Sequence, residues 1–333
     1  MSAMKRRDLV VLLAGPSLLP GWAAAQPSGP AKRIGVLIPY VADDAASQSH
    51  VAVFRTALEQ LGWMDGKNLH VDYRWAGGDF GRMPDLVKEL VAAGSDVLLV
   101  RSTPAALAAM KQGNNTPVVF VVVSDPVGDG LVASLARPGG AVTGFSNVES
   151  SLAGKWLQLL TEIAPRVRRV SCLFNPAVSP GGGTYYLRLL EPAAAALGVG
   201  LVPAPVHDAG EIARVAQALS SDANGGLVVT PDPTTTMYRM DIVTQAAAHK
   251  IPAIFPFPSA STEGGLISYG VDVADLYRRS AGYVDRILRG ARPGDLPVQA
   301  PAKFELAINI RTARTLGLSV PLTLLATADQ VVE

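Results

Sequence analysis

The 333-residue sequence has few of the side chains on which several common functions depend. It contains one cysteine, Cys172, and so cannot form a disulfide within the chain. Its four histidines are scattered, and none stands at the spacing of a zinc site. No glycine-rich dinucleotide motif follows the first predicted strand, and no phosphate-binding loop motif occurs. The sequence therefore predicts neither a cofactor nor a metal.

The chain also lacks an excess of charge of one sign and a long apolar run. With 29 basic and 28 acidic residues, its net charge of +1 gives no electrostatic reason to expect a nucleic acid as partner. Hydrophobic residues make up 49% and charged residues 17%, enough to form sizeable cores, and the length suggests two domains. No apolar stretch after the N-terminus approaches the length of about 20 residues that spans a bilayer, so the mature chain is predicted not to cross a membrane.

The first 25 residues have the layout of a secretory signal peptide. The basic residues Lys5 to Arg7 precede a short apolar stretch, which ends in an alanine triplet before Gln26. Cleavage near Ala25 would deliver the protein to the periplasm. The Arg6-Arg7 pair leaves the Sec and twin-arginine routes both open, and the absence of a cysteine after the triplet argues against a lipid anchor.

The rest of the chain alternates apolar, β-rich runs with amphipathic helical segments, and this pattern occurs in two successive rounds. Such alternation is typical of parallel sheets that are covered by helices on both faces. The sequence therefore predicts an α/β protein with two doubly wound parallel-sheet lobes. The expected strands are 34–38, 69–75, 96–100, 118–123 and 142–145 in the first round, then 170–174, 199–203, 226–229, 253–257 and 266–269, with a last strand at 304–310.

Short polar and aromatic side chains follow the predicted strands, at the sheet edge where ligands collect in open α/β sheets. Thr103, ahead of Pro104, could begin a helix whose exposed N–H groups favour an anion, and Asp125 and Asp232 could accept hydrogen bonds from a ligand ammonium. The same residue types also serve as helix caps and turn formers, so a purely structural role stays open for each. The candidate ligand-binding residues are Tyr40, Ser102, Thr103, Ser124, Asp125, Ser146, Asn147, Asn175, Asp232 and Phe257.

Several longer motifs resemble the ABC transporter substrate-binding protein family that includes the TrpX-like proteins. The most specific is Asp125-Pro-Val-Gly-Asp-Gly-Leu-Val132, followed by Leu135-Ala-Arg-Pro-Gly-Gly-Ala-Val-Thr-Gly144. The resemblance implies a type I periplasmic binding fold, with two lobes joined by three crossovers. It places lobe 1 at residues 32–147 plus 271–298, and lobe 2 at residues 148–270 plus 299–333. It also implies ligand contacts at Ser102-Thr103, Ser124-Asp125, Asn175 and Asp232, and an ABC permease with its ATPase in the inner membrane as partner.

The predicted function is that of an extracytoplasmic substrate-binding protein, not an enzyme. It would capture a small molecule, such as an aromatic amino acid or a related carboxylate, between its lobes, and would act as a monomer. One alternative is a ligand-sensing protein that serves a membrane receptor through the same cleft. Another is an α/β isomerase or hydrolase that uses Asp125 or Asp232 as a base.

Overall fold

The computed structural model describes residues 30–333, apart from the side chain of Ser150. The predicted signal peptide, residues 1–25, lies outside the described residues. Within the described part of the chain, no helix combines the length and the hydropathy needed to cross a membrane.

The first lobe is a five-stranded sheet in which all strands are parallel. Its central strands are buried throughout because alternate residues enter two different cores. Leu99 packs with α1 (Ala45–Gln60) and α10 (Val273–Leu288) on one face. Leu98 and Val100 pack with α2 (Met83–Ala92) and α3 (Thr103–Gln112) on the other. The strands, in spatial order, are β2 (Leu69–Trp75), β1 (Lys32–Ile38), β3 (Val97–Arg101), β4 (Val118–Val123) and β5 (Val142–Ser146), and the helices are α1 (Ala45–Gln60), η1 (Phe80–Arg82), α2 (Met83–Ala92), α3 (Thr103–Gln112), α10 (Val273–Leu288) and η3 (Pro293–Asp295).

The second lobe is a seven-stranded sheet with the same two-sided packing. Helices α4 and α5 cover one face and α6 and α8 the other. The strands, in spatial order, are β7 (Gly200–Pro205), β6 (Arg169–Phe174), β8 (Gly225–Val229), β9 (Ala253–Phe255), β10 (Ile267–Val271), β11 (Phe304–Asn309) and β12 (Gln330–Val332). The helices are α4 (Ser150–Ile163), η2 (Pro180–Gly183), α5 (Thr184–Leu197), α6 (Ala209–Leu219), α7 (Pro233–Met237), α8 (Arg239–Ala248), α9 (Ser259–Thr262), α11 (Ile310–Thr315) and α12 (Leu322–Thr327).

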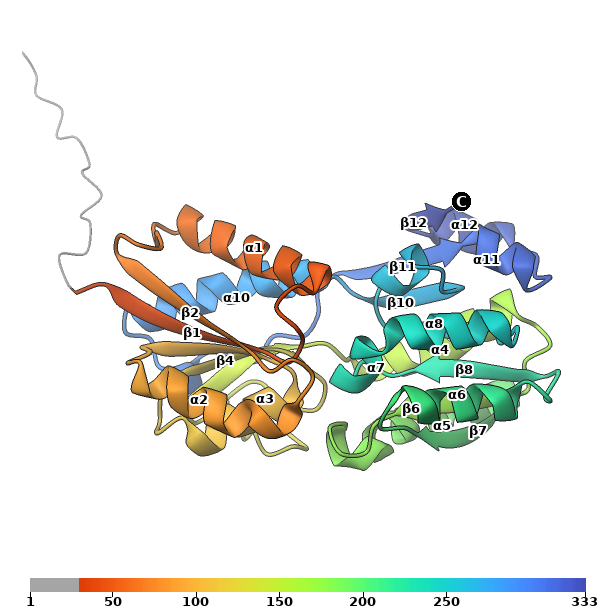
Figure 1. Cartoon of the computed structure of the whole chain (residues 1–333), viewed down its shortest axis with the longest axis horizontal. Coiled ribbons are helices and arrows are strands. Elements are labelled where there is room, and N and C mark those ends of the chain that lie inside the picture. Colours follow the sequence, from red (N-terminus) through yellow and green to blue (C-terminus); the bar gives the residue numbers. More distant parts are fainter. Residues whose placement is uncertain (1–29) are drawn as a thin grey trace, which may run out of the picture. The chain divides into compact units, whose positions relative to one another are not determined.

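The chain passes between the two sheets three times. It leaves the first sheet after β5, returns after β10 to form α10, and crosses again before β11. In Figure 1 the blue helix α10 accordingly lies among the red and orange elements of the first lobe. The predicted fold class, two doubly wound lobes joined by three crossovers, is confirmed.

Two features of the second sheet differ from the prediction of purely parallel strands. The strand β11 pairs with β10 in the antiparallel direction, and the short strand β12, which the sequence did not suggest, pairs with β11. The antiparallel direction follows from the third crossing, because the chain re-enters the second lobe from the end at which β10 leaves it.

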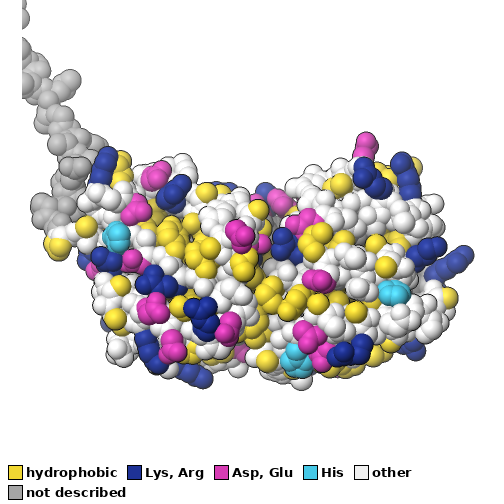
Figure 2. Space-filling model, viewed as in Figure 1, with side chains coloured by type: hydrophobic (Ala, Val, Ile, Leu, Met, Phe, Trp, Pro, Cys, Tyr) yellow, Lys and Arg dark blue, Asp and Glu magenta, His cyan; other side chains and the backbone are white. Residues whose placement is uncertain are grey.

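The ends of the strands are followed by short acidic residues that begin helices. The carboxylate of Asp44 caps α1, that of Asp232 caps α7, and that of Asp272 caps α10. Because parallel strands end at one edge of each sheet, these helix starts gather where the lobes meet. On the face shown in Figure 2, hydrophobic side chains lie along this meeting line, and basic and acidic side chains are interspersed over the remainder.

Candidate functional site: a pocket lined by both lobes

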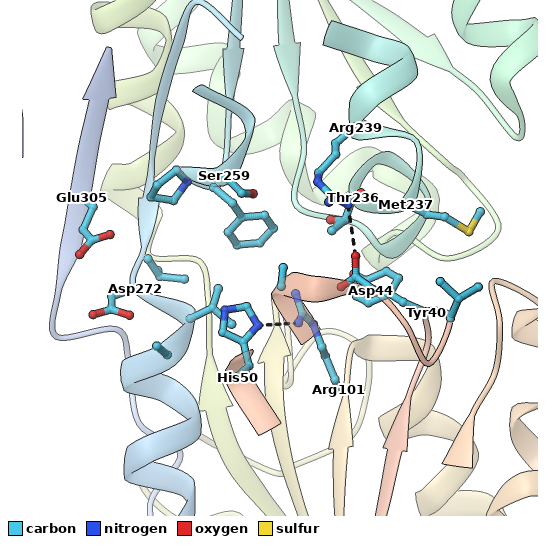
Figure 3. A pocket seen from close by; sticks show the side chains of 17 residues that line it. Tyr40, Asp44, His50, Arg101, Thr236, Met237, Arg239, Ser259, Asp272 and Glu305 are labelled. Carbon is cyan, nitrogen blue, oxygen red and sulfur yellow. Dashed lines mark hydrogen bonds and ion pairs between the residues drawn. The ribbon is translucent and has the colours of Figure 1, made fainter. Parts of the chain in front are cut away.

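A pocket of about 240 Å³ opens where the two lobes meet. Residues at or just after the ends of β1, β3 and β10 form one wall, and residues around α7 and β9 form the other (Figure 3). The volume lies slightly below the range of about 300–1,000 Å³ that is typical of sites for drug-sized ligands, so the pocket suits a small metabolite. Its lining residues include Tyr40, Asp44, His50, Arg101, Thr236, Met237, Arg239, Phe257, Pro258, Ser259, Asp272 and Glu305.

Arg101, the last residue of β3, places a buried guanidinium at the floor of this pocket. One terminal nitrogen lies 3.2 Å from Nδ1 of His50, and the guanidinium stacks over the ring of Tyr40 at 4.9 Å. It also hydrogen-bonds to Tyr277 on α10, whereas its buried Nε has no partner. Burial and the adjacent Arg101 lower the pKa of His50 to about 3, so His50 is neutral at physiological pH.

The acidic side chains of the pocket all have basic partners. Asp44 lies 3.5 Å from Arg239 of the opposite lobe, and this ion pair links the lobes. Asp272 and Glu305 share Lys303, at 2.9 Å and 2.8 Å. Burial raises the pKa of Asp44, but hydrogen bonds from Ser47 and the charges of Arg239 and Arg101 outweigh it and hold the pKa below its ordinary value.

Apolar groups complete the walls of the pocket. Tyr40 is buried, and burial raises the pKa of its hydroxyl, so the residue presents a neutral aromatic ring. Phe257 and Met237, both from the second lobe, pack partly buried against the same core as Tyr40. A planar apolar group could therefore lie between aromatic and thioether side chains while its polar end reached Arg101.

Of the predicted site residues, Tyr40 and Phe257 line this pocket, but several others surround a separate, much smaller space on the other side of Tyr40. That space is about 10 Å³, roughly room for one water, and is lined by Tyr40, Ser102, Thr103, Ser124 and Asp232 among others. Ser102 has a φ of 88°, and its buried Oγ has no partner. Strained backbone tends to cluster at active sites, ligand contacts and switch regions.

Two more predicted residues, Ser146 and Asn147, lie with Ser124 at the first crossing between the lobes. Ser124 donates a hydrogen bond to the side-chain oxygen of Asn147 at 3.1 Å, and its hydroxyl lies 2.9 Å from that of Tyr186 in the opposite lobe. Ser146 lies 3.4 Å from the carbonyl oxygen of Gln299, which belongs to the third crossing. These contacts place the three residues at the connection between the lobes rather than in the 240 Å³ pocket.

Asn175 and Asp232 form one hydrogen-bonded unit inside the second lobe. The carboxylate of Asp232 accepts from the backbone N–H groups of Asn175, Thr234 and Thr235. It also accepts from the hydroxyls of Ser179 and Thr230. Burial raises the pKa of Asp232, and these donors act in the opposite direction. Donors within the protein therefore satisfy both carboxylate oxygens of Asp232. Contact of Asn175 or Asp232 with a ligand stays a prediction.

Asp125 lies in a turn on the first lobe. Its carboxylate accepts the backbone N–H of Gly128 at 2.9 Å, and its side chain does not line the 240 Å³ pocket. The nearby Asp129 faces Gly181 of the second lobe, and burial together with Asp125 raises the pKa of Asp129 to about 6. The turn-forming role that the sequence left open accounts for the geometry of Asp125.

The sequence-based reasoning missed the charged residues of the pocket. It treated His50 as a surface or satisfied histidine, expected little ligand specificity from the segment that holds Asp44, and did not consider Arg101 or Arg239. One signal was present, because Arg101 is a basic residue at the end of an otherwise apolar strand. No local pattern marks Arg239, which reaches the pocket from the start of α8.

Two α/β lobes that together line a pocket define the architecture of a two-lobed binding protein. Among residues 30–333, no group of three or more histidine, cysteine or acidic side chains is placed to hold a metal ion. The family model described as ABC transporter substrate binding protein matches residues 33–332, and the chain belongs to this family. As predicted, it is a substrate-binding protein of an ABC transporter and not an enzyme.

Individual relatives are similar over most of their length. A tyrosine-binding protein of Clostridioides difficile (strain R20291) is 27% identical over 290 residues, which cover 86% of this chain and 81% of the relative. The crystal structure of an ABC domain from Streptococcus pneumonia in complex with L-Trp is 25% identical, with a TM-score of 0.84 and coverage of 91% and 100%. An ABC transporter solute-binding protein from Agrobacterium vitis, with bound allitol, has a TM-score of 0.61 at 14% identity, covering 86% and 97%, and shows the type I periplasmic binding fold alone.

Proposed function

We propose that this protein captures a small aromatic amino acid, or a related aromatic carboxylate, in the pocket between its lobes and delivers it to an ABC permease and ATPase in the inner membrane. The observation on which this depends is the pocket itself, which combines a buried guanidinium with aromatic and apolar walls from both lobes. The proposal includes export to the periplasm by the signal peptide at 1–25, action as a monomer, and lobes at 32–147 plus 271–298 and at 148–270 plus 299–333.

The relatives support an aromatic ligand. One is named for tyrosine, and another was crystallised with L-Trp. The pocket here supplies the ring contacts that such ligands need, from Tyr40 in one lobe and from Phe257 and Met237 in the other. A ligand that contacts both lobes binds the closed arrangement more tightly than the open one, and it therefore shifts the protein toward closure. In the closed arrangement, Asp44 and Arg239 would pair across the lobes.

The direct test is a thermal-shift and calorimetric screen of the exported, processed protein. The panel comprises L-Trp, L-Tyr and L-Phe, the corresponding arylpropionates, and polyols as a neutral hydrophilic set. A ligand at 100 times its Kd stabilises the native state by about 2.7 kcal/mol, which raises the Tm of a protein of this size by about 5 °C. We expect such a shift for at least one aromatic acid and none for the polyols.

A matched control separates this pocket from other sites. The substitution Phe257→Ala removes an aromatic wall and should weaken binding of the aromatic acid, whereas Leu322→Ala, at an 82% exposed position on α12, should not. A response to polyols alone, or equal affinity in both variants, would contradict the proposed function.

A further inference from the structure

The groups that directly contact the guanidinium of Arg101 are neutral, and the carboxylate of Asp44 acts on it only from beyond ion-pair distance. His50 offers a ring nitrogen at 3.2 Å, Tyr277 a hydroxyl and Tyr40 the face of its ring. Because the pKa of His50 is lowered to about 3, the imidazole is neutral and accepts a hydrogen bond from Arg101. None of these groups cancels the positive charge.

No carboxylate of residues 30–333 lies within 4 Å of this guanidinium, although Arg101 is only 4% exposed. Of the acids that line the same pocket, Asp272 and Glu305 share Lys303. Asp44 lies 3.5 Å from Arg239, which also binds Glu263 at 2.8 Å, and it makes no ion pair with Arg101. A buried charge without a counter-ion is costly to a protein and is rarely retained unless something pairs with it.

The geometry also distinguishes Arg101 from a structural arginine of the core. An arginine that holds a fold together normally has its N–H groups satisfied by the protein, but Nε of Arg101 is buried without a partner. The side chain reaches the pocket from the carboxyl end of β3, and Figure 3 shows it rising from the floor beside His50 and Tyr40. The neutral partners fix the orientation of the planar group and leave its charge available to the pocket.

We infer that Arg101 binds the carboxylate of the ligand and is the residue that makes this pocket select anionic over neutral aromatic molecules. The inference rests on the proposed function and deepens it by assigning the contact that sets the substrate class. A carboxylate on a guanidinium forms short, charge-assisted hydrogen bonds with defined geometry, which the compact ammonium of lysine cannot reproduce.

The test is a cycle of protein and ligand changes measured by calorimetry. Each amino acid that binds is compared with its amide, for example L-tryptophan with L-tryptophanamide, because the amide keeps the ring and the amine but loses the negative charge. In the unsubstituted protein we expect the acid to bind about 10- to 100-fold more tightly than the amide. Arg101→Met should remove that preference by weakening the acid alone, and Arg101→Lys should restore part of it.

The control is Arg55→Met, which removes one positive charge from an exposed position on α1 and should leave the preference intact. Melting curves without ligand check that the Arg101 variants are folded. Equal affinity for acid and amide in the unsubstituted protein, or an equal loss for both ligands in Arg101→Met, would overturn the inference while the proposed function stood. Failure of every aromatic acid and amide to bind would overturn both.

Discussion

Substitution of Asp232 by alanine should destabilise the second lobe severely, because its carboxylate organises the start of α7. Five donors converge on it: three backbone N–H groups and two hydroxyls, at 2.8 to 3.2 Å. At about 1 kcal/mol for each hydrogen bond, their loss amounts to about 5 kcal/mol. Relief from burying a carboxylate offsets part of this, so we expect Asp232→Ala to lower the free energy of unfolding by about 3–5 kcal/mol.

Urea denaturation followed by circular dichroism measures this change, and Asp208 supplies a matched control. Asp208 also caps a helix, α6, but its carboxylate accepts one backbone N–H, that of Glu211, at an exposed site. Asp208→Ala should therefore cost only about 1 kcal/mol. If Asp232→Ala cost no more than its control and instead abolished ligand binding, then Asp232 would be a ligand residue and the structural reasoning would be wrong.

Three further predictions concern pH and backbone geometry. The pKa of His50 is about 3 in the folded protein, whereas in the unfolded chain it has its ordinary value of 6.5. Only the unfolded chain binds a proton between these values, so the contribution of His50 to stability is lost as the pH falls below about 6.5. Relative to the unsubstituted protein, His50→Gln should gain about 2 kcal/mol between pH 7.5 and pH 5, and a difference independent of pH would contradict this. The pKa of Asp129 is raised to about 6, so stability is lost as the pH rises from about 4 to about 6, and the loss is complete above that pH. Asp129→Asn should stabilise the protein by about 1.5 kcal/mol at pH 7.5, allowing for solvent screening, and should have no effect below about pH 4 in the same denaturation assay. Gly183 has a φ of 91°, and a Cβ there would lie 2.2 Å from the ring of Phe174, so Gly183→Ala should cost about 2 kcal/mol or more in urea denaturation, and an unchanged midpoint would refute the packing argument.

The Arg101 arrangement shows how stability and binding can oppose one another in this pocket. A buried guanidinium without a directly contacting carboxylate weakens the unliganded protein, and a ligand carboxylate that makes this contact recovers that free energy on binding. The neutral state of His50 is required for this arrangement, because a protonated imidazole would repel the guanidinium of Arg101 beside it. We therefore expect ligand affinity to be insensitive to pH between about 5 and 8.

The strand pattern was predictable because it is a local property. The apolar runs of β3, β4, β6 and β8 are buried on both faces, and this is the composition that the sequence shows directly. The short strand β12 was not predictable, because its three residues, Gln330–Val332, acquire their partner only when β11 has returned to the second lobe. Pairing of that kind depends on the third crossing and leaves no periodic signal.

The candidate site was predictable in location but less so in its residues. The sequence indicated the carboxyl ends of the strands, and Tyr40 and Phe257 do line the pocket. It favoured Ser102 and Asp232, whereas the structure places Ser102 beside a smaller space and surrounds Asp232 with protein donors. Arg101 and Ser102 are adjacent, and their side chains face different spaces, so the identity of the pocket residue depends on which face of the strand the other lobe covers.

The sequence by itself determined the two rounds of βα units, the burial of their strands and the edge at which polar groups accumulate, because periodicity and composition act over a few residues. Only the tertiary structure decided that Arg101 makes no ion pair within residues 30–333, that Asp44 pairs with Arg239 across the lobes and that His50 is neutral. Charge pairing and desolvation depend on atoms brought together from distant parts of the chain, and no local pattern encodes them.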